Sequence, residues 1–240
     1  MKQLKTVVLA FMIIGAAIVT SCTTGLSGEI KREDRSVKDF TGVELAISGD
    51  VFLKQGDNYS LIIEADKDIL ERIETEVDGN VLRIRSQKGY SFGWSNTKIS
   101  IYVTMPVVER LSISGSGDIK AESSIKSESL SLSISGSGDI SIPNLAVVNL
   151  KATISGSGDI DVAGSGNAQT AEISVSGSGD ITFNNIKFVD ADVSIVGSGD
   201  AYVDVKENLN ARIVGSGDIR YSGNPIVDAK ITGSGELKGR

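Results

Sequence analysis

The chain has 240 residues, with 24 basic side chains against 31 acidic ones and a formal net charge of −7. It contains no His and a single Cys, which excludes Ser-His-Asp and Cys-His catalysis, His-ligated metal sites and a disulfide framework. The acidic balance also argues against nucleic-acid binding, because recognition of a phosphate backbone needs clustered Lys and Arg.

The first 21 residues are typical of a secretion signal. Two lysines precede an uncharged apolar run over residues 7–19, which is short for a membrane-spanning helix. The segment ends with Ser directly before Cys22, and this pattern resembles a bacterial lipobox, in which the Cys is acylated. An ordinary signal peptide followed by an unmodified Cys is the alternative. We favour the lipobox, with residues 1–21 removed, a lipid on Cys22 and a polar tether over residues 22–36.

Residues 37–110 carry strand patterns without a regular repeat. Alternating apolar positions predict strands at residues 43–47, 51–54, 60–64, 81–84 and 99–103. A short helix is expected within residues 65–74, started by Asp66 or Asp68, and Asp78-Gly79 predicts a hairpin turn. We interpret this part as irregular opening coils with a cap, because terminal repeats close an open core.

The second half, residues 111–240, is dominated by one tetrapeptide, Gly-Ser-Gly-Asp. Six copies end in an aspartate and a seventh ends in a glutamate, at Asp118, Asp139, Asp159, Asp180, Asp200, Asp218 and Glu236. The spacings of 21, 20, 21, 20, 18 and 18 residues fit neither the calcium roll of nine residues nor helical repeats of about 33 or more.

The flanks of each tetrapeptide alternate strictly between apolar and polar residues, as in Leu132-x-Ile134 before one copy and Ile140-x-Ile142 after it. This period of two gives each strand one apolar face. Such strand pairs become stable when stacked coils share a core, so we predict an all-β fold, a parallel β-solenoid of 20-residue coils over residues 37–240. An antiparallel β-sandwich is the alternative, but its hairpins would not need the same corner in every repeat.

Several motifs in combination resemble the GIN head domain of auto-transporter adhesins. They are Ser48-Gly49-Asp50-Val51, Gln55-Gly56-Asp57, Glu64-Ala65-Asp66, Thr75-Glu76-Val77, Met105-Pro106 and the repeated Ile-Ser-Gly-Ser-Gly-Asp. The resemblance covers residues 38–238. It implies a right-handed parallel β-helix in a secreted or lipid-anchored envelope protein of Gram-negative bacteria, and it implies no established activity or catalytic residues.

Two groups of side chains are candidates for ligand contact. Tyr90, Phe92 and Trp94 lie between glycines and could stack on a sugar or enter a partner's pocket, although we favour a role in covering the apolar end or side of the solenoid. Hydroxyls form two rows before the corners, one with Ser112, Ser133, Thr153, Ser174 and Ser194, the other with Ser114, Ser135, Ser155 and Ser176. We interpret these rows as a solvated outer face in preference to an ice- or glycan-binding surface.

Stacked corners would place the seven acidic residues named above along one edge, which we call the acidic ladder. Carboxylates ~5 Å apart repel by about 0.8 kcal/mol per pair in water, so the edge needs compensation. We expect each carboxylate to accept backbone N–H groups at its own corner while water screens the rest. The alternative is calcium bound between coils; otherwise no metal or other cofactor is expected.

Together these features predict a non-enzymatic lipoprotein of the bacterial outer membrane, periplasmic or surface-exposed, that binds an unknown protein or glycan partner. The alternative is a lyase or hydrolase acting on acidic polysaccharide, since other parallel β-helices host such enzymes. The last coil has no evident cap, so its edge is expected to be blunted by Lys238 and Arg240 or covered in an end-to-end homo-oligomer.

Overall fold

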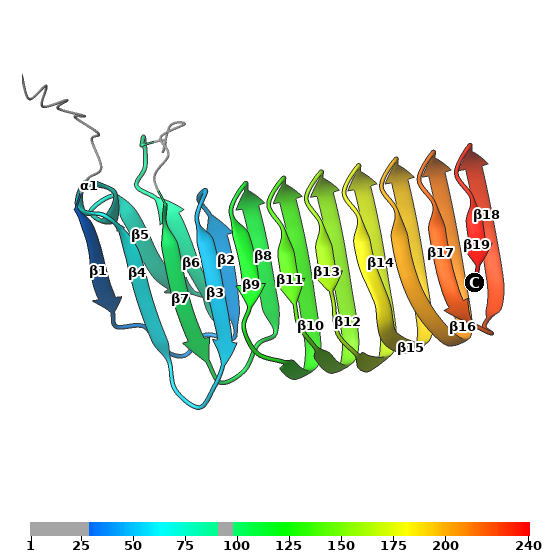
Figure 1. Cartoon of the computed structure of the whole chain (residues 1–240), viewed down its shortest axis with the longest axis horizontal. Coiled ribbons are helices and arrows are strands. Elements are labelled where there is room, and N and C mark those ends of the chain that lie inside the picture. Colours follow the sequence, from blue (N-terminus) through cyan, green and yellow to red (C-terminus); the bar gives the residue numbers. More distant parts are fainter. Residues whose placement is uncertain (1–28, 91–97) are drawn as a thin grey trace, which may run out of the picture.

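The computed structural model describes residues 29–90 and 98–240 and is a β-solenoid of about 6 turns (Figure 1). Within these ranges the chain forms nineteen strands that join in one continuous sheet, and one short helix. The predicted all-β solenoid is therefore confirmed. The signal segment, Cys22, Phe92 and Trp94 lie outside the described residues.

The regular part winds from corner to corner over residues 110–240. The strands that run up to the corners are β8 (Arg110–Gly115), β10 (Ile125–Gly136), β12 (Leu145–Gly156), β14 (Gly166–Gly177) and β18 (Ile226–Gly233). The strands that leave them are β9 (Asp118–Ala121), β11 (Ile140–Ile142), β13 (Ile160–Val162), β17 (Ile219–Gly223) and β19 (Leu237–Gly239). Two longer strands, β15 (Ile181–Gly197) and β16 (Ala201–Gly215), continue from one corner to the next.

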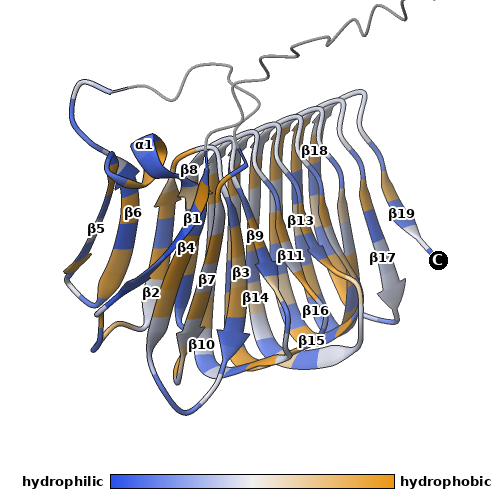
Figure 2. Ribbon diagram, turned by 60° about the vertical axis from the view of Figure 1, so that its left-hand side comes forward, coloured by the Kyte–Doolittle hydropathy of each residue, from blue (hydrophilic) through white to orange (hydrophobic). Residues whose placement is uncertain are grey.

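Every coil in this part pairs in parallel with its neighbours, and the corners are in register. Gly136 pairs with Gly115 on one side and with Gly156 on the other, and the same row continues to Gly233. The alternating apolar residues point inward and form a narrow core, seen in Figure 2 as orange bands that alternate with blue along the strands. Only the last coil departs from this, since β18 is exposed along its whole length.

Glycine is required at the corners by two separate constraints. Gly156 has a φ of 146°, and a Cβ built there would lie 2.1 Å from the carbonyl oxygen of Gly136 in the preceding coil. Gly158 has no such φ, but its Cβ would lie 2.0 Å from the carbonyl oxygen of Gly138. Side chains are therefore excluded by the strand spacing itself, in addition to the backbone conformation.

The less regular part contains β1 (Ile30–Arg35), β2 (Gly42–Ala46), β3 (Asp50–Gln55), β4 (Ser60–Asp66), α1 (Lys67–Leu70), β5 (Ile73–Asp78), β6 (Val81–Ser86) and β7 (Ser100–Met105). The helix is shorter than the predicted segment, and Asp66 caps it by accepting the N–H of Asp68. The predicted hairpin is confirmed: Gly79 and Asn80 both have positive φ between β5 and β6, which suits a two-residue turn.

The opening coils do not stack in chain order. Strand β2 pairs with β6 on one side and β8 on the other, and β3 lies in the same way between β7 and β9. The shortened corner at Ser48-Gly49 therefore contacts the first regular corner, where the N–H of Asp118 donates to the carbonyl of Gly49 at 3.1 Å. Antiparallel strands β1 and β4, with α1 and the β5–β6 hairpin, close this end of the solenoid (Figure 1).

Two alanine substitutions separate the two constraints on the corner glycines. Gly115 has a φ of 144° but no atom within 4 Å of a built Cβ, so Gly115→Ala introduces backbone strain alone, about 1–2 kcal/mol. Gly156→Ala adds the overlap with Gly136 and should lower the melting temperature about twice as far, measured by thermal unfolding of both variants. Equal losses would show that coil spacing does not select glycine.

Candidate functional site

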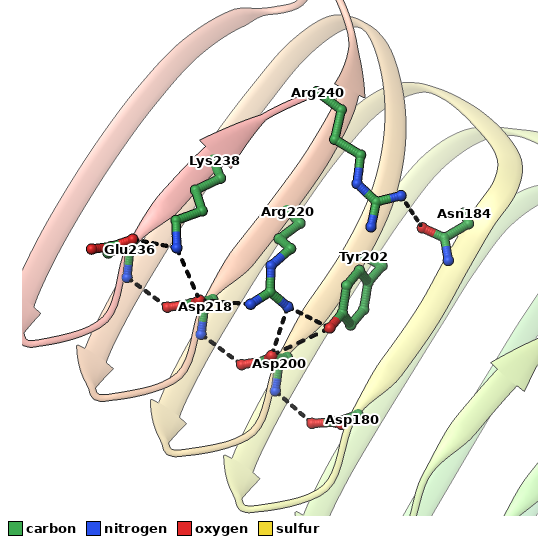
Figure 3. A network of polar contacts seen from close by, with 9 residues as sticks. All are labelled: Asp180, Asn184, Asp200, Tyr202, Asp218, Arg220, Glu236, Lys238 and Arg240. Carbon is green, nitrogen blue, oxygen red and sulfur yellow. Dashed lines mark hydrogen bonds and ion pairs between the residues drawn. The ribbon is translucent and has the colours of Figure 1, made fainter.

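The acidic ladder is held by hydrogen bonds between successive coils. Each aspartate of the ladder accepts the backbone N–H of the ladder residue in the next coil, from Asp139 N–H to Asp118 Oδ1 at 3.1 Å through to Glu236 N–H to Asp218 Oδ1 at 2.9 Å. Figure 3 shows the last four residues of this series. The expected donor at the carboxylate's own corner is therefore wrong, because parallel stacking places the N–H of the next coil against the carboxylate.

Ionised acceptors make stronger hydrogen bonds than neutral ones, so six such bonds along the edge offset much of the repulsion between carboxylates. The described part of the chain contains no group of three or more acidic, His or Cys side chains arranged to hold a metal ion. The hydrogen bonds between coils therefore stabilise the ladder, and the absence of bound calcium stays a prediction.

A second row of side chains lies two residues after the ladder and carries cations at both ends. In register it reads Lys120, Ser141, Asp161, Thr182, Tyr202, Arg220 and Lys238. Sequence analysis missed this row, although its constant offset from each ladder aspartate is visible in the sequence.

At the first end of the row, Lys120 lies 3.2 Å from both Asp50 and Asp118. Partial burial lowers the pKa of Lys120, but the hydrogen bonds that Lys120 donates to the two aspartates, together with their charge, outweigh this and raise the pKa overall. Lys120 therefore links the shortened opening corner to the first regular corner.

At the other end, Arg220 lies 2.9 Å from Asp200 and 2.9 Å from Asp218, and it also contacts the Tyr202 hydroxyl (Figure 3). The hydrogen bond with Asp200 is the main cause of its raised pKa. Lys238 pairs with Glu236, which raises the pKa of Lys238, and lies 3.7 Å from Asp218.

The middle of the edge has no such cations. Asp139, Asp159 and Asp180 form no ion pair within the described ranges, and Asp161 adds a fourth carboxylate between Ser141 and Thr182. Burial raises the pKa of Asp161. The central coils therefore form the most negative part of the corner edge.

A groove crosses the strands that run up to the corners; we call it the outer groove. Two hollows of about 650 and 460 Å³ adjoin one another at Glu172 and Asp192, which line both of them. It is lined chiefly by polar side chains: Glu109, Ser129, Ser131, Asn149, Lys151, Thr170, Glu172, Ser174, Asp192, Ser194, Asn210, Arg212, Asp228 and Lys230.

Hydrogen bonds between coils fix the side chains of the outer groove. The Thr170 hydroxyl donates to Asn149 Oδ1 at 2.9 Å, Lys151 Nζ donates to Glu172 at 2.6 Å, and Asn210 Nδ2 donates to Asp192 at 2.9 Å. Donors and acceptors thus recur along the solenoid axis at the strand spacing of ~4.8 Å. Such a surface suits an extended polar ligand that contacts several coils.

The hydroxyl rows lie as the sequence predicts. Both are in register from coil to coil; the row of Ser114 is exposed, and the row of Ser112 is partly buried. Ser174 and Ser194 of the latter row line the outer groove, together with Arg212 and Lys230, which replace the hydroxyl in the last coils. The feature that sequence analysis treated as a solvated face therefore borders the groove.

The aromatic candidates are described only at Tyr90. Tyr90 is 38% exposed, and the Arg72 guanidinium lies over its ring at 4.3 Å from the ring centroid. The Ser86 hydroxyl donates to the Tyr90 carbonyl at 2.6 Å. Because Phe92 and Trp94 lie outside the described residues, a joint aromatic contact surface stays a prediction.

The family profile described as "Putative auto-transporter adhesin, head GIN domain" matches residues 39–225. The chain belongs to this family. The resemblance seen in the opening motifs and the repeated corners is therefore confirmed, and a search of curated proteins finds no significant match.

Several solved structures have a similar fold. A putative adhesin from Bacteroides fragilis is 26% identical with a TM-score of 0.82, over 89% of this chain and 98% of that one. A putative lipid binding protein from Parabacteroides distasonis is 24% identical with a TM-score of 0.73, over 89% and 98% of the two chains. A putative adhesin from Parabacteroides merdae is 22% identical with a TM-score of 0.73, over 89% and 97%. The last two show the shared fold alone.

Two substitutions at Asp159 test the ladder of this GIN domain. Asp159→Asn keeps an oxygen for the Asp180 N–H and removes a charge, so the melting temperature should be unchanged or raised, most clearly at low salt. Asp159→Ala removes the acceptor and should cost about 1 kcal/mol, or roughly 2–4 °C. The wild-type melting temperature should be the same in EDTA and in millimolar calcium; a large calcium-dependent rise that Asp159→Asn abolishes would instead establish a metal site.

The raised pKa of Asp161 predicts a pH-dependent gain from Asp161→Asn. A carboxyl whose pKa is raised by folding destabilises the folded state as pH rises through its titration, so the variant should gain about 1–2 °C at pH 7 and almost nothing near pH 3. Asp57→Asn removes the same charge from an exposed position and serves as the control. A gain that does not depend on pH would contradict this account.

Proposed function

We propose that this protein is a lipid-anchored, non-catalytic protein of the bacterial outer membrane that binds an extended polar partner, a glycan or a protein segment, along its outer groove. The observation that carries the proposal is that two hollows adjoin on the same strand face, where Glu172 and Asp192 line both of them. Membership of an adhesin-like family supports a binding role.

The polar lining of the groove favours a hydrophilic ligand. Amide, hydroxyl and carboxylate groups from successive coils face one surface, and hydrogen bonds between coils hold them in place, as in the pair of Thr170 and Asn149. A ligand with a repeating backbone could contact equivalent groups in several coils at once. Repetition would then strengthen a weak contact at each coil, as multivalent binding does.

The described residues begin at the end of the solenoid opposite the last coil. Cys22 is the single Cys of the chain, and residue 30, which begins β1, lies at the closed end (Figure 1). Within the described ranges no helix has the length and apolar character needed to cross a membrane. A lipid on Cys22 would hold the closed end at the membrane and leave the outer groove accessible.

Replacing Cys22 tests the anchor. The wild-type chain should fractionate with outer membranes and carry a fatty-acylated Cys22, whereas Cys22→Ser should not be acylated. Mass spectrometry of the purified N-terminal peptide measures the modification directly. An unmodified Cys22 in membrane-extracted protein would reject the anchor without affecting the binding role.

A matched pair of substitutions tests binding at the groove. Thr170→Arg places a bulky cation in the groove. Thr182→Arg places the same side chain outside the groove, in the row that lies two residues after the acidic ladder. Against immobilised neutral and uronate-containing polysaccharides and a panel of envelope proteins, we expect Thr170→Arg to weaken binding at least about tenfold and Thr182→Arg to leave it unchanged. Equal effects would place the binding surface elsewhere, and turnover of a uronate-containing glycan would favour the lyase or hydrolase alternative.

A further inference from the structure

The last coil exposes a row of residues that is buried in every preceding regular coil. Val227 and Ile231 are 37% and 44% exposed, whereas their register partners Leu209 and Ile213 are 1% and 0% exposed. Within the described ranges β18 pairs only with β16, and β19 only with β17. The solenoid therefore presents an apolar core and a free strand edge at this end, a combination that readily pairs with another strand.

Among the residues that the structure describes, the opposite end offers no comparable uncovered row of apolar core positions. On one face of the solenoid the edge strand is β1, which carries five charged residues in six positions. On the other face the edge strand is β5, which carries Glu74, Glu76 and Asp78. Helix α1 and Ile73 cover the core there, so that end is closed, and charged edge strands disfavour further pairing. A head-to-tail stack of copies would leave the apolar end in contact with a charged one.

We propose that the free edge of β18 pairs antiparallel with the β18 of a second copy, around a two-fold axis through Ala229. Backbone geometry permits this pairing. Ser131 lies in the same register row as Asp228, and its N–H donates to the carbonyl of Glu109 in the preceding coil. Residues in this row therefore direct their backbone N–H and C=O groups toward the preceding coil. Strand alternation then directs the N–H and C=O groups of Val227, Ala229 and Ile231 to the free edge.

The side chains complement one another in this register. Val227 lies opposite Ile231 of the second copy on the inner face, which extends the apolar core across the junction. On the outer face Asp228 lies opposite Lys230 of the second copy, and the symmetry repeats the pair. Among the residues the structure describes, the side chains of Asp228 and Lys230 have no hydrogen-bond or ion-pair partner.

Neighbouring registers are disfavoured by charge. Moving the axis to residue 228 would place Asp228 opposite itself, and moving it to residue 230 would place Lys230 opposite itself. Like charges directly opposite in an antiparallel pair are destabilising. The sequence of β18 is thus self-complementary around Ala229, and the inferred dimer goes beyond the proposed binding at the outer groove.

Charge reversal tests this register in the full chain, solubilised in a mild detergent and studied by sedimentation across a wide range of concentrations. Wild type should dimerise, and Asp228→Lys or Lys230→Asp alone should raise the dissociation constant about tenfold or more, because each reversal creates two repulsive pairs. The double variant with both reversals should dimerise as wild type does. A tagged Asp228→Lys chain should also capture an untagged Lys230→Asp chain more tightly than it captures itself.

Arg212→Asp makes the same charge change one coil away from the edge and should leave dimerisation unchanged. Far-UV circular dichroism shows whether each variant keeps its strand content, and the double variant guards against misfolding as the cause of dissociation. A wild-type chain that remains monomeric would overturn the proposal. So would a dimer that survives both single reversals, or single variants that show no preference for one another.

Discussion

The structure depends on the close approach of backbones at stacked corners. Adjacent coils lie at the spacing set by strand hydrogen bonds, and at Gly156 and Gly158 this spacing brings the preceding coil within about 2 Å of where a Cβ would be. Glycine at these positions lets every corner be the same, and identical corners keep all the flanking strands in register. The inward-facing rows and the acidic ladder follow from that register, because each repeats at a fixed offset from the corner.

The ladder shows how repetition compensates for an unfavourable arrangement of charges. Stacking aligns like charges, but it also aligns each carboxylate with the N–H of the next ladder residue. The cations are confined to the ends, where Lys120 joins the opening corner and Arg220 joins two of the last corners. The middle of the edge remains negative and is held by backbone contacts alone, so its charge is available to solvent or to a partner.

Period and composition predicted the regular half of the fold well, because a single strict repeat determines it. The predicted donor to each ladder carboxylate was wrong. An Asp in a turn usually accepts a hydrogen bond from its own turn, and the N–H of the next coil is recognised as the donor only when the coils are stacked. The sequence also did not predict that β2 pairs with both β6 and β8, or that β3 pairs with both β7 and β9. A pairing between distant segments leaves no local pattern in the sequence. The shortened corner at Gly49 indicated a coil but not the strands with which that coil pairs.

The outer groove could not be predicted for a related reason. Its residues come from separate coils, and their alignment in rows is known only once the register is known. The hydroxyl rows were predicted from the sequence, but the amides and carboxylates beside them were not. The shortening of the last coils from 20 or 21 residues to 18 is taken up on the return side, where β15 and β16 show register shifts between Phe183 and Asp190. The corners remain stacked across this change, so the return side is where this fold can vary in length without disturbing its core.

The two ends of the solenoid have opposite character, and this gives the molecule a direction. Charged antiparallel strands close the end where the described chain begins, while the far end leaves apolar rows and a self-complementary strand uncovered. A two-fold axis through Ala229 would turn the two closed ends away from each other. The first described residues of the two copies would then lie at opposite ends of the dimer. This geometry suits a contact between facing membranes, or a dimer lying along one membrane with its outer grooves extending in opposite directions from the junction.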